Sequence, residues 1–484
     1  MASHYRGTRP PTARNATYWT CLTPFSAHSG ALASHSGAVA SEQAETPKKS
    51  SEPQGGHAPR FRPESVGLAA LMASTAAVLL GLAIYLALHL GLLKGVPPDE
   101  VIRTTLTVMA GFAAVLTGVY AYRKQRVSEG DAKRADDEQL TQRYSTAAEK
   151  LGHEKAAVRL AGVIAMARLA DDWSKQRQQC IDVLCAYLRM PTEQDGDLSE
   201  RQVRATIVRT IAAHLREDSA SSWAIHDFDF RGAALHDANF SGATFSGKTT
   251  FSGATFTGKF AIFDKATFTG NFTSFSEATF SGKITSFSEA TFSGNVTSFT
   301  GAKFAGKSTT FYGATFSGEE TTFDRATFSG EETTFYKAKF LRGHTSFDGA
   351  EFAGGQITFY LAKFSGEYTG FTEATFSGEK TTFDGAKFSE GETTFYKAKF
   401  SGGLTSFAVA TFSGRFTRFD GATFSGEGTT FDGAKFSGEY TGFDGATFSG
   451  GTPADIATEG SSFVETHVSW GPITRRTLPN SAHG

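Results

Sequence analysis

The residues of this chain that could carry out chemistry are few, and their spacing fits no reaction centre. Three cysteines occur in the 484 residues. Two of them, Cys180 and Cys185, fall on one predicted helix, where about 140° of rotation separates them. This arrangement fits neither a zinc site nor a disulfide framework, so both are expected to be buried small apolar residues. The 12 histidines show no spacing typical of metal ligands.

Serine is frequent, but its neighbours indicate turns. Ser-Gly pairs recur through the second half of the chain, for example Ser317-Gly318 and Ser329-Gly330. A nucleophilic serine needs a histidine or similar base beside it, and no histidine recurs with the same period. Ser and Gly together are typical turn residues. Glycine-rich phosphate-binding patterns are also missing from the sequence. We therefore predict that the protein is not an enzyme and has no catalytic residue, no cofactor-binding residue, no cofactor and no metal ligand.

The secondary structure that positions these residues can be predicted from the regular spacing of phenylalanine. Phenylalanine recurs from Phe256 to Phe448 in alternating steps of five and seven residues, which gives sixteen periods of 12 residues. A typical period reads ATFSGEETTFDR, at residues 314–325. Such regularity is typical of a solenoid, because each unit is too small to bury its apolar side except by stacking on its neighbours.

Ahead of this register the step is simply five residues. Phe230, Leu235, Phe240 and Phe245 lie in the run DFRGAALHDANFSGATFSG. The A-x-[LF]-x-x pattern resembles the pentapeptide repeat family, and the resemblance covers residues 230–450. It implies a right-handed quadrilateral β-helix over residues 227–450, with one pentapeptide on each face and the central Phe or Leu inside. The residue two positions earlier is then also inside and small. It alternates between Ala and Thr here (Ala254, Ala266, Ala278; Thr249, Thr273, Thr285).

The chain departs from that pattern in every second step, which carries two extra residues. We interpret the extra residues, such as Glu319-Glu320 and Glu331-Glu332, as bulges or short loops at two opposite corners. A coil then holds 24 residues, and eight coils at the usual strand spacing form a rod about 40 Å long. A 12-residue coil is the alternative, and it would crowd two phenylalanine rings into a thin section. The open ends need covers. The helical region before Phe230 could cover one end, and four tail residues could cover the other (Phe463, Val464, Val468, Trp470).

Two uncharged segments precede the repeats. Val66–Leu93 and Thr104–Tyr122 contain 28 and 19 residues without a formal charge, which is long enough to cross about 30 Å of hydrocarbon. Small residues recur at four-residue spacing in both, a pattern that lets helices pack closely in lipid (Ala73, Ala77, Gly81; Ala110, Ala114, Gly118). A buried soluble hairpin and a cleaved signal peptide are the alternatives. Two uncharged segments in succession disfavour the first, and the distance from the N-terminus disfavours the second.

The distribution of basic residues predicts the orientation of this hairpin. Five flank it on the terminal sides (Arg60, Arg62, Arg123, Lys124, Arg126), and only Lys94 and Arg103 lie in the connecting loop. The positive-inside rule therefore places both termini in the cytoplasm of a two-span membrane protein. His89, near the end of the first span, is expected at the membrane interface. The two spans offer too little polar lining for a channel or transporter.

The region between the membrane and the repeats is predicted to be helical. Ala156–Ala170 is apolar nearly all round, as in a buried helix. Cys180, Ile181, Leu184, Cys185 and Leu188 form a helical stripe that stops near Pro191. Ser199 and Gln202 are predicted to form a capping box before the run Val203, Ile207, Ile211 and Leu215. The segment AVRLAGVIAMARLADD resembles an armadillo- or HEAT-like helix and is similar to the juxtamembrane helices of actinobacterial membrane-anchored pentapeptide repeat proteins.

Charge restricts the partners. Residues 230–450 contain 19 Lys and Arg against 22 Asp and Glu, a net charge of −3. This near-balance disfavours nucleic acid as a partner, which requires a basic stripe. It also disfavours the DNA mimicry of acidic pentapeptide repeat rods that act on topoisomerases. Lysines such as Lys337, Lys339, Lys397 and Lys399 lie among the acidic residues.

The fold expected is therefore two transmembrane helices, a small all-α juxtamembrane region and a C-terminal right-handed quadrilateral β-helix. The expected function is a membrane-anchored scaffold with membrane lipid and an unidentified protein as partners. A topoisomerase-directed or other protective inhibitor is the alternative, and homodimerisation stays open. The predicted segments are a disordered leader (1–64), two spans (65–93 and 104–122), an external loop (94–103), a cytoplasmic helical region (123–220), the β-helix (227–450) and a C-terminal cap and tail (451–484).

Overall fold

The computed structural model describes residues 75–76, 78–87, 90, 97–191, 197–449, 462–463, 467–469 and 474–475. Contacts within the chain define two units, Met1–Val119 and Tyr120–Gly484. The predicted leader, residues 1–64, lies outside the described residues.

A single long helix, α2 (Pro98–Leu151), contains the second predicted span. Pro98 at its first position and Asp99 and Glu100 in its first turn suit a helix N-terminus. Among the described residues it is the one helix long and apolar enough to cross a membrane, and none of its apolar window is buried. The helix begins before Thr104 and ends well after Tyr122. The predicted loop 94–103 is thus helical from Pro98 onward.

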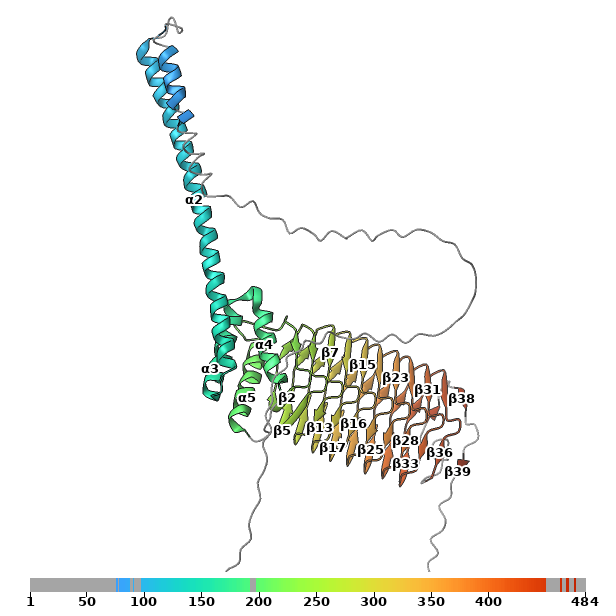
Figure 1. Cartoon of the computed structure of the whole chain (residues 1–484). Coiled ribbons are helices and arrows are strands. Elements are labelled where there is room, and N and C mark those ends of the chain that lie inside the picture. The colour runs from blue at the N-terminus through green and yellow to red at the C-terminus, as the bar shows by residue number, and fades with distance from the viewer. Residues whose placement is uncertain are drawn as a thin grey trace, which may run out of the picture. The chain divides into compact units, whose positions relative to one another are not determined.

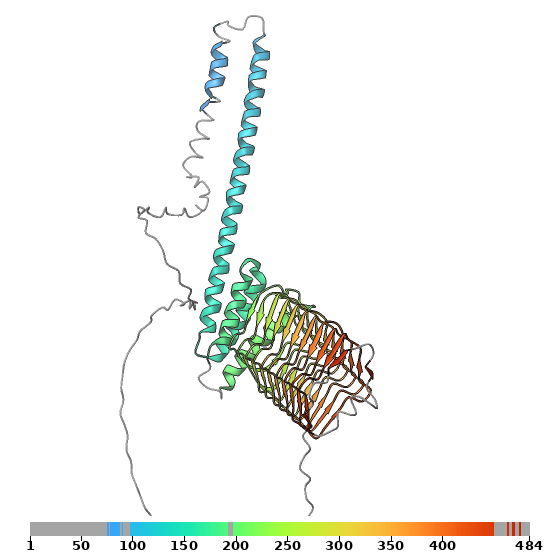
Figure 2. The same ribbon diagram turned by 90° about the vertical axis from the view of Figure 1, so that its right-hand side faces the viewer.

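The first predicted span, Val66–Leu93, is described in part, and its apolar helix Val78–Ala87 is too short to count as a second span. This helix lies beside α2 (Figures 1 and 2), and a Cβ atom added at Gly81 would lie 3.4 Å from the Sδ atom of Met109. This distance is an ordinary van der Waals contact, so the close helix packing expected from the small-residue pattern stays a prediction. Ala73 and Ala77 lie outside the described residues.

Three further α-helices and a short 3₁₀ turn form a small bundle. They are α3 (Ala156–Asp172), η1 (Ser174–Gln176), α4 (Arg177–Arg189) and α5 (Leu198–His214). The predicted apolar stripes of α4 and α5 are fully buried. The expectation that α3 is buried all round is met on one side only: Val163, Met166 and Leu169 are buried, but Ile164 is 48% exposed. Ala157, Ala161 and Arg168 are exposed as well.

The predicted capping box at the start of α5 is wrong. The N-cap residue is Asp197, whose side chain accepts a hydrogen bond from the backbone N–H of Ser199. Ser199 therefore lies inside the first turn. A carboxylate suits this position better than a hydroxyl because it also interacts favourably with the positive end of the helix dipole.

The repeats form a four-sided β-solenoid of about nine turns, which Figure 1 shows as stacked strands from β2 (Ala234–Asn239) to β38 (His467–Ser469). One turn illustrates the four faces. Face 1 contains β15 (Glu320–Thr322), face 2 contains β16 (Thr327–Phe328), face 3 contains β17 (Glu332–Thr334), and face 4 contains β18 (Lys339–Phe340). Each face is a parallel ladder along the rod, and the C-terminal strands face the viewer in Figure 2.

The strand register confirms a coil of 24 residues. Thr297 pairs with Thr321, and Phe304 pairs with Phe328. Of the two extra residues in every second step, the first lies at a corner, as expected, and the second does not. Glu319 is part of the corner between face 4 and face 1, and Glu331 is part of the opposite corner, between faces 2 and 3. Glu320 and Glu332 instead begin the three-residue strands β15 and β17.

Phenylalanine columns fill the centre of the coils. Every central Phe between Phe230 and Phe448 is at most 5% exposed, and the inward Ala and Thr positions named above are buried. Phe311 stacks on Phe335 with ring centroids 4.7 Å apart, and it meets Phe323 edge to face at 5.5 Å. Stacking along a column and edge contacts between opposite columns are both favourable aromatic geometries. The core therefore has no room for a ligand channel.

The corners after the three-residue strands need a left-handed residue. Arg325 has a φ of 55° at one of these corners, and Gly301 has a φ of 66° at the same place in the preceding coil. A side chain in this conformation costs roughly 1–2 kcal/mol relative to glycine. About half of these corners nevertheless carry a side chain, so the stacked core compensates for the strain.

Both ends of the solenoid are extended by other elements. At the first coil, the backbone N–H of Thr244 donates to Leu215 O at the end of α5, and Trp223 is fully buried. At the far end, Phe463 in β37 (Ser462–Phe463) pairs with Phe436, and Val468 in β38 pairs with Thr441. The tail thus continues the ladders by a further strand. Val464 and Trp470 lie outside the described residues.

Candidate functional site

The outer surface of the solenoid carries a column of three tyrosines at the corner between faces 3 and 4. Tyr312, Tyr336 and Tyr360 occupy the same position in successive coils, and we call them the tyrosine ridge. Ring centroids are 5.4 Å apart both between Tyr312 and Tyr336 and between Tyr336 and Tyr360. Tyr312 is 38% exposed and Tyr360 is 42% exposed. The ridge is therefore an aromatic surface that the fold leaves open to solvent.

The local sequence fixes the direction of these tyrosines. Each tyrosine directly follows an inward phenylalanine, which itself follows the face 3 strand. The tyrosine therefore lies where the chain bends from face 3 to face 4. The backbone N–H of Tyr336 donates to Thr334 Oγ1, and that of Tyr360 donates to Thr358 Oγ1, both at 3.1 Å. Such hydroxyl-closed turns orient the residue that follows. Asp384 takes the same position one coil later, with the same bond to Thr382.

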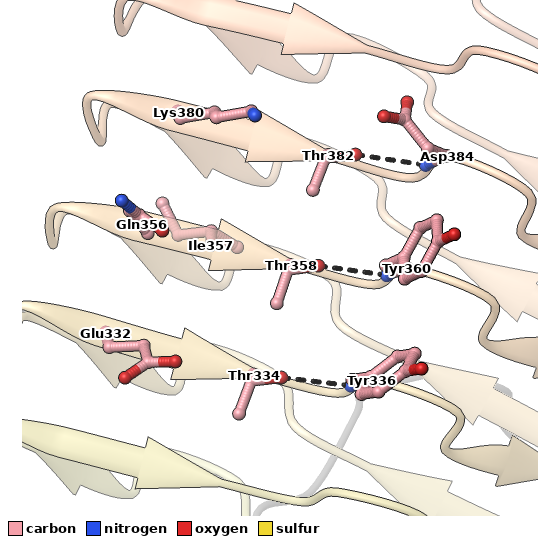
Figure 3. Close-up of a pocket in the computed structure, with 10 residues that line it drawn as sticks. All are labelled: Glu332, Thr334, Tyr336, Gln356, Ile357, Thr358, Tyr360, Lys380, Thr382 and Asp384. Carbon is pink, nitrogen blue, oxygen red and sulfur yellow. Dashed lines mark hydrogen bonds between the residues drawn. The ribbon is translucent and has the colours of Figure 1, made fainter.

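A shallow depression of about 380 Å³ lies beside the ridge on face 3 (Figure 3). Glu332, Gln356 and Lys380 line one side of it, in direct register across β17, β21 (Gln356–Thr358) and β25 (Lys380–Thr382). Tyr336, Tyr360 and Asp384 line the opposite side, and three threonines lie between the two sides. The lining is polar and the depression is open. It is thus suited to a polypeptide surface more than to an enclosed small molecule.

A row of lysines lies on the other side of the ridge. Lys339, Lys363 and Lys387 pair directly across β18, β22 (Lys363–Phe364) and β26 (Lys387–Phe388) on face 4, and we call them the lysine row. All three are exposed. Within the described part of the chain, none of them forms an ion pair, whereas Lys307 pairs with Glu331 at 2.9 Å. The lysine row is therefore an uncompensated strip of positive charge.

The ridge and the row are joined in the sequence. Lys339 follows Tyr336 by three residues and Lys363 follows Tyr360 by three, with a buried alanine between them. Lys337 lies over the Tyr336 ring at 4.8 Å, and its interaction with the Tyr336 hydroxyl raises the pKa of the Lys337 ammonium. The two columns thus form one continuous surface of aromatic and cationic groups.

The residues considered first for chemistry are placed as expected. Cys180 and Cys185 are buried, and burial raises their pKa values to about 11 and about 12. Ser317 and Gly318 lie at the corner between β14 (Thr315–Phe316) and β15. Among the described residues, no group of three or more His, Cys, Asp and Glu side chains could hold a metal ion. The predictions of no catalysis, no cofactor and no metal are not tested by that finding.

The titratable groups that do meet in the helical bundle have structural partners. Asp171 accepts a hydrogen bond from Trp223 Nε1 at 2.9 Å and lies 3.2 Å from His214 Nε2, while His214 stacks on Trp223. Glu200 binds Arg159 and Arg204, each at 3.0 Å, and accepts a hydrogen bond from Tyr187. These contacts tie the helices to one another and to the first coil.

Sequence reasoning missed the ridge and the row. The net charge of residues 230–450 sums the charges on all four faces. It therefore does not reveal a strip of positive charge that lies on one face only. Aligning the sequence at 24-residue intervals would have revealed both columns, because it places Tyr312, Tyr336 and Tyr360 above one another. That alignment requires the coil length, for which the sequence favoured 24 residues but still allowed 12.

Comparison with known proteins supports the identity of the repeats. Residues 230–279 and 275–327 match the family model of pentapeptide repeats, which describes nine copies. Residues 230–327 of this chain thus contain pentapeptide repeats, and the same ladders continue beyond them to Phe448. No curated protein and no solved structure matches the chain.

Proposed function

We propose that this protein is a membrane-anchored, non-enzymatic scaffold whose solenoid presents the tyrosine ridge and the lysine row to a protein partner. The observation that carries the proposal is the alignment of large exposed side chains on successive coils. In several other coils the outward position on face 4 holds threonine, for example Thr291, Thr315 and Thr411. Aromatic residues are enriched at protein interfaces because they bury a large area at a small entropic cost.

The anchor is argued from α2. Its apolar side chains are exposed on the surface, for example Leu106 (63% exposed) and Val115 (65% exposed). A contiguous apolar surface of this kind is unstable in water and stable in hydrocarbon. The neighbouring helix Val78–Ala87 is the described part of a second span in this proposal. The basic residues after Tyr122 then place both termini in the cytoplasm.

The rest of α2 serves as a stalk in this arrangement. Residues 123–151 are rich in charge and follow the predicted span directly, and a helix of this length measures about 43 Å. Its last turns pack on the helical bundle, where Arg143 pairs with Asp172 at 2.6 Å. We propose that the bundle couples the anchor to the solenoid and covers the first coil.

Crosslinking in native membranes tests the scaffold. The intact chain is compared with a Tyr336→Ser/Tyr360→Ser variant, and we expect the variant to lose a defined crosslinked protein. Tyr396→Ser is the matched control. Tyr396 is 41% exposed and has Lys397 over its ring at 4.8 Å, but it belongs to a different corner and stacks on no other tyrosine among the described residues. Identical crosslinked proteins in all three samples would contradict the proposal.

Accessibility of introduced cysteines tests the orientation. A cysteine at Gly95 is expected to react with a membrane-impermeant reagent added outside the cell. One at Ser128, on the stalk, is expected to react only after the membrane is opened. The opposite pattern, or equal labelling of both sites in intact cells, would refute a hairpin with cytoplasmic termini.

Inhibition of a topoisomerase by DNA mimicry is the alternative function. That activity requires an extended acidic face. The lysine row argues against it on face 4, and Lys303 and Lys399 argue against it on face 2. A supercoiling assay with the purified protein would reveal this activity directly.

A further inference from the structure

The lysine row is not required by the fold. Thr291 and Thr315 occupy the equivalent positions in the two coils before Lys339, and Thr411 does so in the coil after Lys387. Threonine therefore fits this ladder, and it is also a favourable strand residue. Like charges directly opposite one another in a sheet are destabilising. Repulsion among three successive lysines thus lowers the stability of the solenoid, and a bound anion would relieve that repulsion.

The surroundings of the row limit the width of such an anion. On one side lies the tyrosine ridge, continued by Leu361, which is 40% exposed. On the other side, the corner between faces 4 and 1 carries Glu319, Glu367 and Glu390 next to Arg342. The positive strip is consequently about one strand wide. Its first border is aromatic beside Lys339 and Lys363 and carries Asp384 beside Lys387, and its second border is mainly acidic.

We propose that the ridge and the row together bind an extended acidic segment of a partner protein, in which acidic residues alternate with aromatic or aliphatic ones. This proposal rests on the scaffold function and specifies the chemistry of the partner. In an extended segment, successive side chains point to opposite sides. Carboxylates on one side would meet the lysine row, while the apolar side chains would lie against the tyrosines.

The length of the row suits a short segment. Lys387 lies two coils from Lys339, and Lys435 in β34 (Lys435–Phe436) adds a fourth cation two coils further along the same face. At about 4.8 Å for each coil, the four lysines extend over roughly 19 Å. An extended chain of about six residues covers this distance.

Broad polyanions fit less well. A lipid surface or a nucleic acid duplex pressed against face 4 would also meet Glu319, Glu367 and Glu390, and these carboxylates would repel it. A single extended chain avoids them because it is narrower than the face. Single-stranded nucleic acid and anionic lipid are therefore treated as competing outcomes of the test.

Fluorescence anisotropy with the full chain in a neutral detergent tests the proposal. The probe is a labelled peptide of about ten residues in which Glu and Tyr alternate, and a Gln-Tyr peptide of the same length is its neutral counterpart. We expect Lys339→Gln/Lys363→Gln/Lys387→Gln to weaken binding of the Glu-Tyr peptide by about tenfold or more. Tyr336→Ser/Tyr360→Ser should weaken it as well, and added salt should weaken it in the unmodified chain.

The matched control changes three lysines away from face 4. Lys283, Lys303 and Lys399 are also exposed, and the last two hold the equivalent strand position on face 2. Their replacement by Gln alters the net charge equally and is expected to leave the affinity within about twofold. Thermal melting of each variant shows whether the solenoid is intact, and loss of the lysine row should leave the melting temperature unchanged or raise it.

Three results would overturn the proposal. The first is equal affinity of the Glu-Tyr peptide for the unmodified chain and for the variant lacking the lysine row. The second is equal binding of the Glu-Tyr and Gln-Tyr peptides. The third is displacement of the peptide by an oligothymidine or by a soluble short-chain phosphatidylglycerol at lower concentration than by unlabelled peptide. Peptide binding without any partner in native membranes would instead count against the scaffold function alone.

Discussion

Phe335 and Phe359 lie one coil apart in the solenoid and stack face to face, with ring centroids 4.8 Å apart and planes within 1° of parallel. Phe335 also meets Phe323 and Phe347 edge to face, at 5.6 Å each. Each ring is thus held by neighbours above, below and across the core. Stability in such a stack comes from contacts between neighbouring coils.

Shortening this side chain is therefore expected to open the rod locally. Phe335→Ala should lower the free energy of unfolding by about 3–5 kcal/mol, and Phe335→Asp should lower it further because a charge would be buried without a partner. Chemical denaturation followed by circular dichroism measures the change. Tyr336→Ala, at the next residue but on the surface, is the control. An unchanged transition for Phe335→Asp would disprove the inward position of the ring.

The corner glycines differ in how much space they have, and this gives a second prediction. A Cβ atom at Gly294 would lie 1.8 Å from Gly270 O, whereas one at Gly282 would lie 3.5 Å from Gly258 O. Gly294→Ala should therefore force the backbones of adjacent coils apart and lower the melting temperature by several degrees. Gly282→Ala should be tolerated at the equivalent corner. Equal melting temperatures for the two variants would contradict the close packing of the coils.

The two buried thiols are expected to be unreactive. Burial raises the pKa of Cys180 to about 11 and that of Cys185 to about 12, so both stay protonated at neutral pH, and the thiolate is the reactive form. With Cys21 replaced by Ser, the native protein should show almost no reaction with a thiol reagent at pH 8. The denatured protein should show two equivalents. Rapid labelling in the native state would mean that the bundle opens readily.

Asp348 supplies a prediction on pH. Burial raises the pKa of this carboxyl above its ordinary value of 3.8. The folded state then binds the proton more tightly than the unfolded state, so stability is highest below the ordinary value and falls as pH rises through the raised one. Asp348→Asn keeps an oxygen that accepts the bond from Thr372 N, at 2.7 Å in the native protein, and should stabilise the solenoid at pH 7.

The pH profile separates this effect from a general change in charge. The advantage of Asp348→Asn should shrink as the pH falls through the raised value, because the native carboxyl becomes neutral there as well. Asp432→Asn, at an exposed corner, is the control and should change the melting temperature little at either pH. A variant that destabilises the protein at pH 7 would show that the carboxylate is favourable where it lies.

Much of the architecture was predictable because the period is strict. The alternation of five- and seven-residue steps identified the inward phenylalanines and the inward Ala and Thr positions. The phenylalanines and alanines are buried, and so are the threonines, apart from the half-buried Thr429. The apolar stripe from Val203 to Leu215 was equally clear. The N-cap of α5 was not, because both Asp197 and Ser199 are good caps, and the choice depends on where the preceding chain enters the helix.

The sequence by itself determined which side chains of this protein face inward, since a repeat that buries one phenylalanine in each step allows no other phase. The tertiary structure decided which outward residues become neighbours. Tyr336 and Tyr360, like Lys339 and Lys363, are 24 residues apart and meet only because the coil closes after four faces. Neighbours across coils depend on the length of the whole turn, and one period does not reveal that length. The ridge and the row are therefore products of the fold.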